Sequence, residues 1–154
     1  MAATRATGVL RKAGVEHRLM EYEYRSDDAA AWAAEALQIE PERMFKSLVA
    51  VAGDRHVFAL LPASADLSLK RLAAAAGAKH AQMAVPRDAE RLTGYQVGGI
   101  SPLGARRALP VFLDASAEGF GLVCLNAGAR GLIVELATGD LVRLTNATLV
   151  DLQA

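Results

Sequence analysis

Apolar residues recur along this chain with two alternating periods, one typical of helices and the other typical of strands. A period near 3.6 predicts amphipathic helices, and capping or terminating residues mark several of their ends. Asp27 and Asp28 suit the start of an alanine-rich helix, whereas Gly14 suits the end of the first one. The predicted helices cover residues 4–13, about 29–38, from a cap at Asp66 or Ser68 to near Gly77, about 86–93 beginning at Pro86, and about 138–144.

The strand-like runs are short, and tight turns join several of them. Gly53-Asp54 separates two apolar runs and predicts a β-hairpin. The predicted strands cover residues 17–24, 44–52, 55–61, 111–114, 122–126, 132–136 and 148–152. Because turns rather than crossover helices join several strands, we expect an α+β (mixed α/β) fold. It would be a single domain over residues 1–154, with a curved, mixed, largely antiparallel sheet, a partly open barrel, packed with helices.

Composition narrows the class of protein. The 154 residues are 53% hydrophobic and 22% charged, which is the balance of a globular domain. No apolar run approaches the length that spans a bilayer, and the first residues lack the apolar stretch of a signal peptide. The single cysteine cannot form an internal disulfide. We therefore expect a cytoplasmic protein without a membrane partner.

The 17 basic and 17 acidic residues are unevenly distributed along the chain. Residues 67–107 hold seven basic residues and two acidic ones, whereas residues 1–66 hold eight and ten, and residues 108–154 hold two and five. Such an excess forms either an ordinary solvated face or a local footprint for an anion such as an RNA end.

A glycine-rich segment over residues 93–104 interrupts a chain that is otherwise rich in alanine and leucine. Its sequence is Thr-Gly-Tyr-Gln-Val-Gly-Gly-Ile-Ser-Pro-Leu-Gly. The pair Gly98-Gly99 lets the backbone adopt a positive φ or approach a ligand closely, and Pro102 restricts the exit direction. The segment is either a tight turn or a loop that presents backbone N–H groups to a phosphate or a developing oxyanion.

Lys46 is the second candidate, because it lies within an apolar strand-like run. Period-two alternation places it on one face with Met44 and Leu48, and places Ser47 on the other face. A lysine in this position either extends to solvent at the strand end or points into a cleft, where it can hold a phosphate or polarise a carbonyl.

Other residues with chemical potential are isolated from suitable partners. Cys124 has no neighbouring base and is expected to be a small core residue. The three histidines lack metal-ligand spacing, so we expect no metal site. The turn over residues 126–131 is either an ordinary hairpin turn or a second pocket wall with Arg130 at an anion. Asp114 suits either a helix cap or a pocket carboxylate.

Taken in order, several segments resemble the YbaK family of aminoacyl-tRNA deacylases, which is related to the editing domain of bacterial prolyl-tRNA synthetases. The resemblance covers nearly the whole chain, and the glycine-rich segment is its most specific part. The matching segments are residues 21–23 (Glu-Tyr-Glu), 41–48 (Pro-Glu-Arg-Met-Phe-Lys-Ser-Leu), 66–70 (Asp-Leu-Ser-Leu-Lys), 93–104, 109–115 (Leu-Pro-Val-Phe-Leu-Asp-Ala) and 130–132 (Arg-Gly-Leu).

The resemblance implies removal of a wrong amino acid from tRNA, most typically cysteine from proline tRNA. In that family the lysine that matches Lys46 is needed for activity, and the residues matching Tyr22 and 98–102 help to form the pocket. The family chemistry for cysteine is substrate-assisted: the substrate thiol attacks its own ester carbonyl and releases tRNA and a cyclic thiolactone. The protein then supplies positioning and charge stabilisation, which agrees with the lack of an evident nucleophile or base.

From the residues and the resemblance together we expect a trans-editing hydrolase that uses no cofactor and no metal. Its partners would be the acceptor end of an aminoacyl-tRNA and prolyl-tRNA synthetase. The expected catalytic residues are Lys46, Gly98, Gly99, Ile100 and Ser101. The expected substrate-binding residues are Tyr22, Ser47, Tyr95, Pro102, Asp114, Gly128, Arg130 and Gly131.

Two positions depart from the family pattern. Ile133 stands where cysteine-specific members often carry an aspartate, and Ala129 stands where a lysine is often found. The resemblance therefore leaves open a deacylase for alanine or another small amino acid. It also leaves open a binding module for tRNA or a synthetase without turnover, and an enzyme acting on free esters or thioesters.

Overall fold

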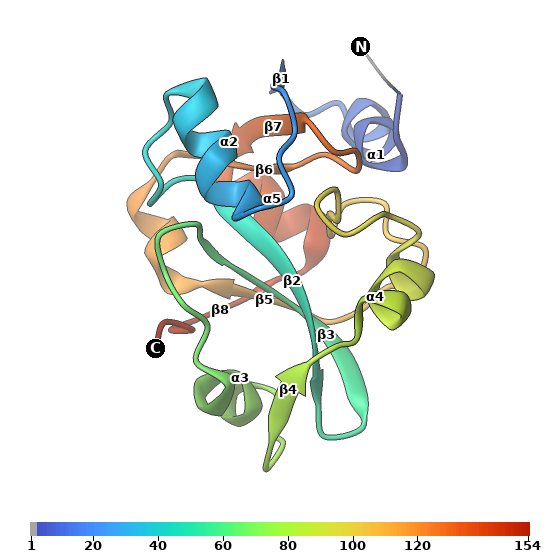
Figure 1. The fold of residues 1–154 in the computed structure, drawn as a ribbon, viewed down its shortest axis with the longest axis vertical. Helices are drawn as coiled ribbons and strands as arrows, with labels where there is room; N and C mark the ends of the chain where they lie inside the picture. The colour runs from blue at the N-terminus through green and yellow to red at the C-terminus, as the bar shows by residue number, and fades with distance from the viewer. Residues whose placement is uncertain (1–2) are drawn as a thin grey trace.

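The computed structural model describes residues 3–154, which contain five α-helices, one short 3₁₀ helix and eight β-strands (Figure 1). The helices are α1 (Arg5–Ala13), α2 (Ala29–Leu37), α3 (Leu69–Ala75), α4 (Pro86–Thr93) and α5 (Thr138–Thr145), and the 3₁₀ helix is η1 (Ala115–Gly119). The strands are β1 (His17–Glu21), β2 (Phe45–Ala52), β3 (Arg55–Pro62), β4 (Ala81–Met83), β5 (Val111–Asp114), β6 (Leu122–Asn126), β7 (Leu132–Ala137) and β8 (Thr148–Val150). No helix in this part of the chain is long and apolar enough to cross a bilayer.

The strands form two sheets. Strands β1, β7 and β6 make an antiparallel three-stranded sheet, and the second sheet has the order β4-β2-β3-β5-β8. In the second sheet, β5 pairs in parallel with both β3 and β8. The expected α+β fold with mixed, largely antiparallel pairing is confirmed, and the two sheets do not close into a barrel.

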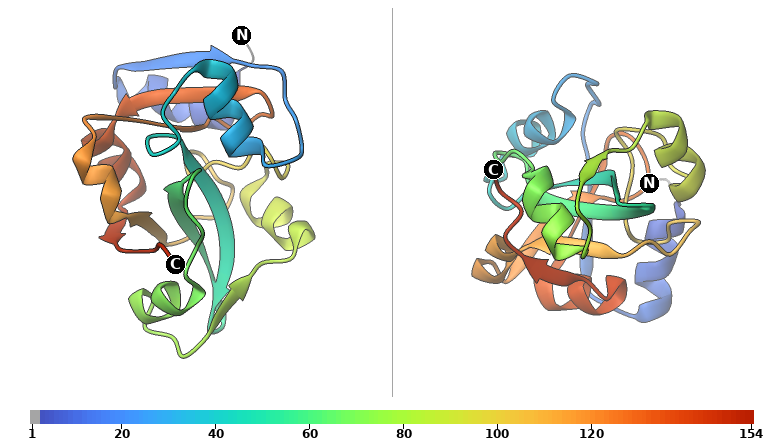
Figure 2. Two further views of the ribbon diagram at one scale, coloured as in Figure 1. Left: turned by 60° about the vertical axis from the view of Figure 1, so that its left-hand side comes forward. Right: turned by 90° about the horizontal axis from the view of Figure 1, so that it is seen from below.

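The β2–β3 hairpin extends from the small sheet to the far end of the molecule, where α3 and β4 lie (Figure 2). Its predicted turn is confirmed, because Ala52 pairs with Arg55 across Gly53-Asp54. At the other end of β2, Met44 forms an isolated parallel bridge with Cys124 of β6. The first residues of β2 therefore lie where the two sheets meet.

Local sequence accounts for most helix boundaries. Thr4 and Thr7 form a reciprocal capping box at α1, and Gly14 ends this helix with a φ of 67°. Pro86 opens α4, and Gly94 ends it with a φ of 78°. Of the two caps considered for α3, Ser68 is the one used, since its side chain accepts a hydrogen bond from the Arg71 N–H at 3.1 Å.

Three local features differ from the prediction. Asp28 precedes α2 in a left-handed conformation with a φ of 48° and makes no side-chain capping bond. Strand β4 was not predicted, because Ala81-Gln82-Met83 lacks β-branched residues and is ordered by pairing with β2. The 3₁₀ helix η1 was also not predicted, and it begins where Asp114 accepts a hydrogen bond from the Ser116 N–H.

The largest core cluster lies between the two sheets and includes Phe45, Phe58 and Leu125. A second cluster lies beneath α2, where Ala33 packs with Met44, Cys124 and Ile133. This second cluster matters for function because three of its buried members also line a cavity.

Candidate active site

A cavity of about 440 Å³ opens where the start of β2 faces α2 on one side and the segment from β4 to the glycine-rich loop on the other. This volume is typical of small-molecule sites. The wall is contributed mainly by residues 22–33, 44–49 and 83–100, with Asn126 and Ile133 closing the side of the small sheet. The cavity is therefore assembled from segments distant in sequence.

Lys46 and Ser47 line this cavity at the start of β2. None of the ion pairs within residues 3–154 uses Lys46, so its ammonium group is available to a ligand. The Ser47 hydroxyl oxygen is buried and has no hydrogen-bond partner in the same part of the chain. Because buried polar atoms are almost always paired, this hydroxyl is a second candidate ligand contact.

The glycine-rich loop reaches the cavity through Gly98 and Ile100. Gly98 has a φ of 93°, and a Cβ atom there would lie 2.7 Å from Cζ of Tyr24 and would overlap its hydroxyl group. Glycine suits this position because side chains disfavour this backbone region, and a Cβ atom would in addition displace the Tyr24 ring. The positive φ expected from the glycine pair is thus present at its first member.

The backbone donors of this loop are not equivalent. The Gly99 N–H donates to the Gln96 carbonyl at 2.8 Å, so it is already used within the loop. By contrast, the N–H groups of Gly98 and Ile100 donate to no acceptor within residues 3–154, and both residues line the cavity. These two N–H groups are the candidates for binding an oxyanion.

The turn over residues 126–131 supports the loop from behind. The Asn126 side chain donates to the Gly98 carbonyl at 3.0 Å and accepts from the Gly128 N–H at 2.8 Å. Arg130 Nε donates to the Val97 carbonyl at 2.9 Å, and its guanidinium lies 5.0 Å from the centre of the Tyr24 ring. Of this turn only Asn126 lines the cavity, so the expected second wall with Arg130 at an anion is not observed, and Arg130 instead fastens the loop.

Several expected site residues lie outside the cavity wall and support it. Tyr95 is buried and donates its hydroxyl to the Leu103 carbonyl at 2.7 Å. The hydroxyl of Ser101, also buried, accepts from the Leu103 N–H at 3.2 Å. The cavity wall likewise does not include Gly99, Pro102, Asp114, Gly128, Arg130 or Gly131.

Asp114 acts as a structural cap. Its carboxylate accepts from the Ser116 N–H at 3.2 Å, the Leu152 N–H at 2.8 Å and the Gln153 side-chain amide at 3.0 Å. Burial tends to raise the pKa of this carboxyl, but these hydrogen bonds hold it below its ordinary value. Asp114 thus attaches the C-terminal segment to β5, and of the two interpretations open from sequence the cap is the one observed.

Tyr22 lines the cavity beside α2. Burial raises the pKa of its hydroxyl, so the group is protonated at neutral pH and can donate a hydrogen bond. Ile133 is buried against the same side of the cavity, beside Met44 and Ala33. This side of the cavity therefore has an apolar patch, formed by Ile133, Met44 and Ala33, and is also lined by Tyr24, Ser26 and Asp28.

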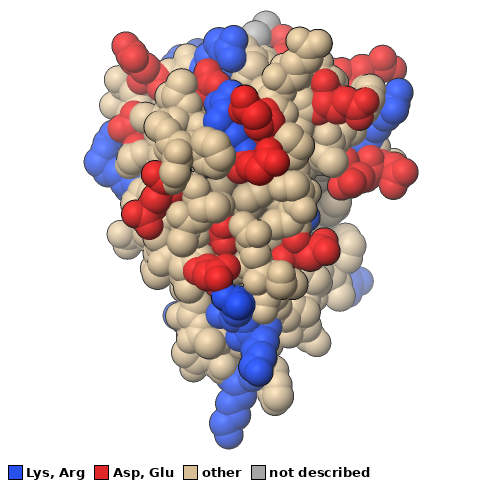
Figure 3. Space-filling model, turned by 90° about the vertical axis from the view of Figure 1, so that its left-hand side faces the viewer, with Lys and Arg blue, Asp and Glu red and all other residues tan. Residues whose placement is uncertain are grey.

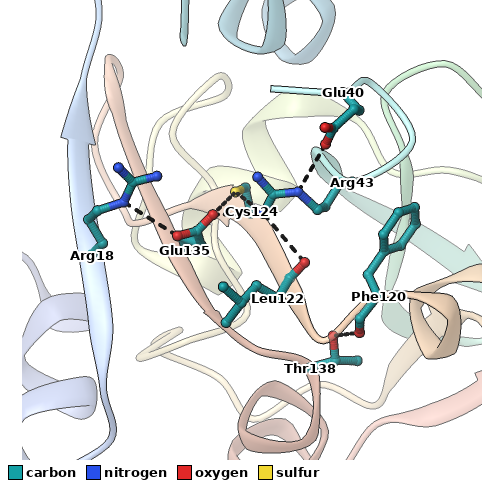
Figure 4. A network of polar contacts seen from close by, with 8 residues as sticks. All are labelled: Arg18, Glu40, Arg43, Phe120, Leu122, Cys124, Glu135 and Thr138. Atoms are coloured by element: carbon teal, nitrogen blue, oxygen red, sulfur yellow. Dashed lines mark hydrogen bonds and ion pairs between the residues drawn. The ribbon is translucent and has the colours of Figure 1, made fainter. Parts of the chain in front are cut away.

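Cys124 is a core residue, as expected, but the sequence did not reveal its charged neighbours (Figure 4). Arg43 Nη1 contacts Glu135 Oε2 at 2.7 Å, and Arg18 Nε contacts the other carboxylate oxygen at 3.3 Å. Burial, partly offset by Arg43, raises the pKa of the Cys124 thiol to about 11. The thiol is therefore not a nucleophile at neutral pH, and the charged residues attach the start of β2 to β7.

The sequence analysis missed Tyr24, Asn126 and the alanine face of α2 as parts of the site. Asn126 before a Gly-containing turn was a usable signal, since Asn side chains often bond to the backbone two residues on. The alanines carried no such signal.

Within residues 3–154, no group of three or more His, Cys, Asp or Glu side chains is arranged to hold a metal ion.

Comparison with known proteins identifies similar chains. Residues 27–144 match the family model described as "Aminoacyl-tRNA editing domain". The chain is 34% identical over 151 residues to the Enterococcus faecalis protein named "Putative Cys-tRNA(Pro)/Cys-tRNA(Cys) deacylase EbsC", covering 97% of this chain and 92% of that protein. It is 32% identical over 99 residues to the Escherichia coli K12 "Multifunctional Ser/Thr-tRNA deacylase ProXp-y", covering 64% of this chain and 59% of that protein.

A solved structure has the same fold. The "Crystal structure of a putative trans-editing enzyme for prolyl tRNA synthetase" superimposes with a TM-score of 0.87 and 26% identity, over 100% of this chain and 99% of the other. The family match spans most of the chain, and the relative from Enterococcus faecalis aligns over nearly its full length. This chain therefore belongs to the aminoacyl-tRNA editing domain family.

Proposed function

We propose that this protein is a trans-editing hydrolase that removes a small, wrongly attached amino acid from tRNA, with cysteine on proline tRNA as the first candidate. The observation that carries the proposal is the cavity itself. Its wall combines an unpaired lysine, Lys46, with two unused backbone N–H groups, at Gly98 and Ile100, and it contains no histidine or cysteine.

These groups suit an ester whose carbonyl oxygen gains negative charge during cleavage. A positioned cation and backbone donors stabilise that charge without a protein nucleophile, and one such donor is worth about 100-fold to 1,000-fold in rate. With a cysteinyl ester, the substrate sulfur attacks the carbonyl carbon and the bond to the ribose oxygen breaks. The thiol proton passes to the ribose oxygen, and the products are tRNA and a cyclic thiolactone.

The apolar patch of the cavity wall supports a small and weakly polar amino-acid side chain. Ile133, Met44 and Ala33 offer no partner to a charged group, and a thiol or a methyl group suits such surroundings. The second candidate is therefore deacylation of alanine. In that case water must attack, because the substrate has no thiol.

The domain would comprise residues 1–154 and act in the cytoplasm, where tRNA is charged. With no net charge, it should bind bare tRNA weakly and with strong salt dependence. We expect prolyl-tRNA synthetase to supply part of the tRNA identity. A ternary complex that deacylates faster than the protein alone would support this partner, and a tight, salt-insensitive complex with bare tRNA would contradict it.

The proposal is tested by measuring amino-acid release from proline tRNA charged separately with cysteine, alanine and proline. Lys46→Ala is the test variant, and Lys12→Ala, on the exposed last turn of α1, is the matched control. We expect loss of cysteine, slowed at least about 100-fold by Lys46→Ala and unaffected by the control. Loss of alanine instead would support the second candidate.

Three results would contradict the proposal. Equal rates for Lys46→Ala and the wild type would remove the assigned role of Lys46. Binding of charged tRNA without hydrolysis above the buffer rate would instead indicate a binding module. Hydrolysis of free amino-acid esters without any preference for tRNA would indicate a small-molecule esterase.

A further inference from the structure

Two arginines converge on the outer side of the glycine-rich loop. A Cβ atom at Gly94, the residue that ends α4, would lie 2.7 Å from Nη1 of Arg5 and 3.5 Å from Nε of Arg106. The two guanidinium nitrogens are thus no farther apart than the sum of these distances. Arg5 begins α1 and Arg106 follows the loop, so they are distant in sequence.

Neither guanidinium forms an ion pair or a side-chain hydrogen bond within residues 3–154, and both side chains are exposed. Arg107, next to this pair, is also exposed and is not used in those ion pairs. Cations held this close repel one another, and the partial negative charge at the end of α4 offsets only part of that repulsion. A bound anion would relieve this repulsion, and arginine is the residue best suited to bind a phosphate.

The arginine pair is connected to the cavity by the loop itself. A Cβ atom at Gly104 would lie 2.8 Å from the backbone carbonyl of Arg5, so the start of α1 packs directly against the end of the loop. The loop passes between α1 and α4 (Figure 1), and its middle part, at Gly98 and Ile100, lines the cavity. An anion at the arginine pair would therefore lie on the other side of the loop from the cavity.

The charge distribution around the cavity favours anion binding on the flank that carries Arg5 and Arg106. The opposite side of the cavity belongs to residues 22–33, which contain three acidic residues and one basic one, whereas residues 67–107 contain seven basic and two acidic. On the face turned away from α4, the upper part carries several acidic side chains with basic ones among them, and the lower end carries mainly basic ones (Figure 3). A polyanion that enters the cavity is thus repelled on the α2 side and attracted on the α4 side.

We propose that Arg5 and Arg106 bind phosphates of the acceptor strand of tRNA while its terminal aminoacyl-adenosine occupies the cavity. The inference rests on the proposed function for the identity of the RNA. The pair acts in binding rather than in chemistry, since it lies outside the cavity wall. Arg106 is one of the seven basic residues of segment 67–107, none of which lines the cavity.

The test is binding of an uncharged proline-tRNA acceptor-stem microhelix, followed by fluorescence anisotropy across a series of KCl concentrations. The test variant is Arg5→Gln/Arg106→Gln. The control is Arg71→Gln/Arg143→Gln, which removes the same charge from arginines that already pair with Asp151 and Asp140. Each lost phosphate contact lowers the slope of log K against log salt by about 0.7 to 0.9.

We expect the test variant to lower that slope by about 1 to 2 and to raise Kd about tenfold or more, whereas the control leaves the slope unchanged. In deacylation the test variant should raise KM and leave kcat unchanged. If the double variant melts early, Arg106→Gln alone serves, because this exposed loop side chain has no partner in the described chain to lose.

Three results would each overturn the inference: an unchanged slope in the test variant, an equal decrease of the slope in the control variant, or no binding of the microhelix by the wild type. Failure of the proposed function gives a different pattern. In that case no charged tRNA is hydrolysed by the wild type, yet the microhelix binding still decides the role of the two arginines.

Discussion

Replacement of Gly99 by alanine is the sharpest test of how the glycine-rich loop is held. A Cβ atom at Gly99 would lie 2.9 Å from both the carbonyl carbon of Ala129 and the amide nitrogen of Arg130. Both are backbone atoms and cannot rotate away. Because carbon atoms in contact lie about 3.5 to 4.0 Å apart, the loop and the turn must separate by roughly 0.6 to 1 Å.

That separation acts on two hydrogen bonds that join the loop to the turn, from Arg130 to the Val97 carbonyl at 2.9 Å and from Asn126 to the Gly98 carbonyl at 3.0 Å. Overpacking costs about 1 to 3 kcal/mol, and each weakened bond up to about 1 kcal/mol. We expect Gly99→Ala to lower the free energy of unfolding by about 2 to 3 kcal/mol. A misplacement near 1 Å costs about 100-fold in rate, so deacylation should fall by a similar factor.

The assay is urea unfolding combined with single-turnover release of cysteine from proline tRNA. The matched control is Gly139→Ala in the first turn of α5, where a Cβ atom would meet nothing within 4 Å. Alanine there should stabilise by about 0.4 to 1 kcal/mol and leave the rate unchanged. If Gly99→Ala matched this control in both measurements, the close approach of the two backbones would not hold the loop in place.

Three further predictions concern the surrounding structure. Burial tends to raise the pKa of the Glu135 carboxyl, but Arg43 and Arg18 hold this pKa below its ordinary value. The ionised carboxylate therefore stabilises the fold at pH values above its unfolded pKa, and this stabilisation is lost as the pH falls through its folded pKa. Glu135→Gln should therefore destabilise by about 1 to 3 kcal/mol at pH 7 and much less at pH 3, and an equal cost in urea unfolding at both pH values would refute the ion pair. Tyr95→Phe leaves the Leu103 carbonyl unpaired and should cost about 1 to 2 kcal/mol in the same assay; no cost would contradict the bond. Cys124, with a thiol pKa of about 11, should react with a disulfide reagent at pH 8 only when urea unfolds the chain, and fast reaction of the folded protein would disprove its burial.

Local sequence was sufficient to predict the ends of an element where one or two residues control the backbone conformation. Gly14, Pro86 and the Gly53-Asp54 turn set the ends of α1, α4 and the β2–β3 hairpin as predicted, because their conformations depend on φ restrictions rather than on distant contacts. Strand β4 was missed, because its order comes from pairing with β2.

The residues of the candidate site also divide into those that local sequence predicts and those that it does not. Lys46 was predictable, since a charge within an apolar run is a local signal, and so was the glycine-rich loop. The burial of Tyr95 and Ser101 was not, and neither was the position of Asp114 beneath the C-terminal segment.

By itself, the sequence determined which residues carry donors, charge and backbone freedom, because these are properties of single residues and short segments. Only the tertiary structure decided which of them meet. Tyr24 packs against Gly98, Asn126 supports the loop from another strand, and Arg5 lies beside Arg106. These pairs are separated by tens of residues, and their distances are set by how the two sheets and their helices pack, which no local pattern encodes.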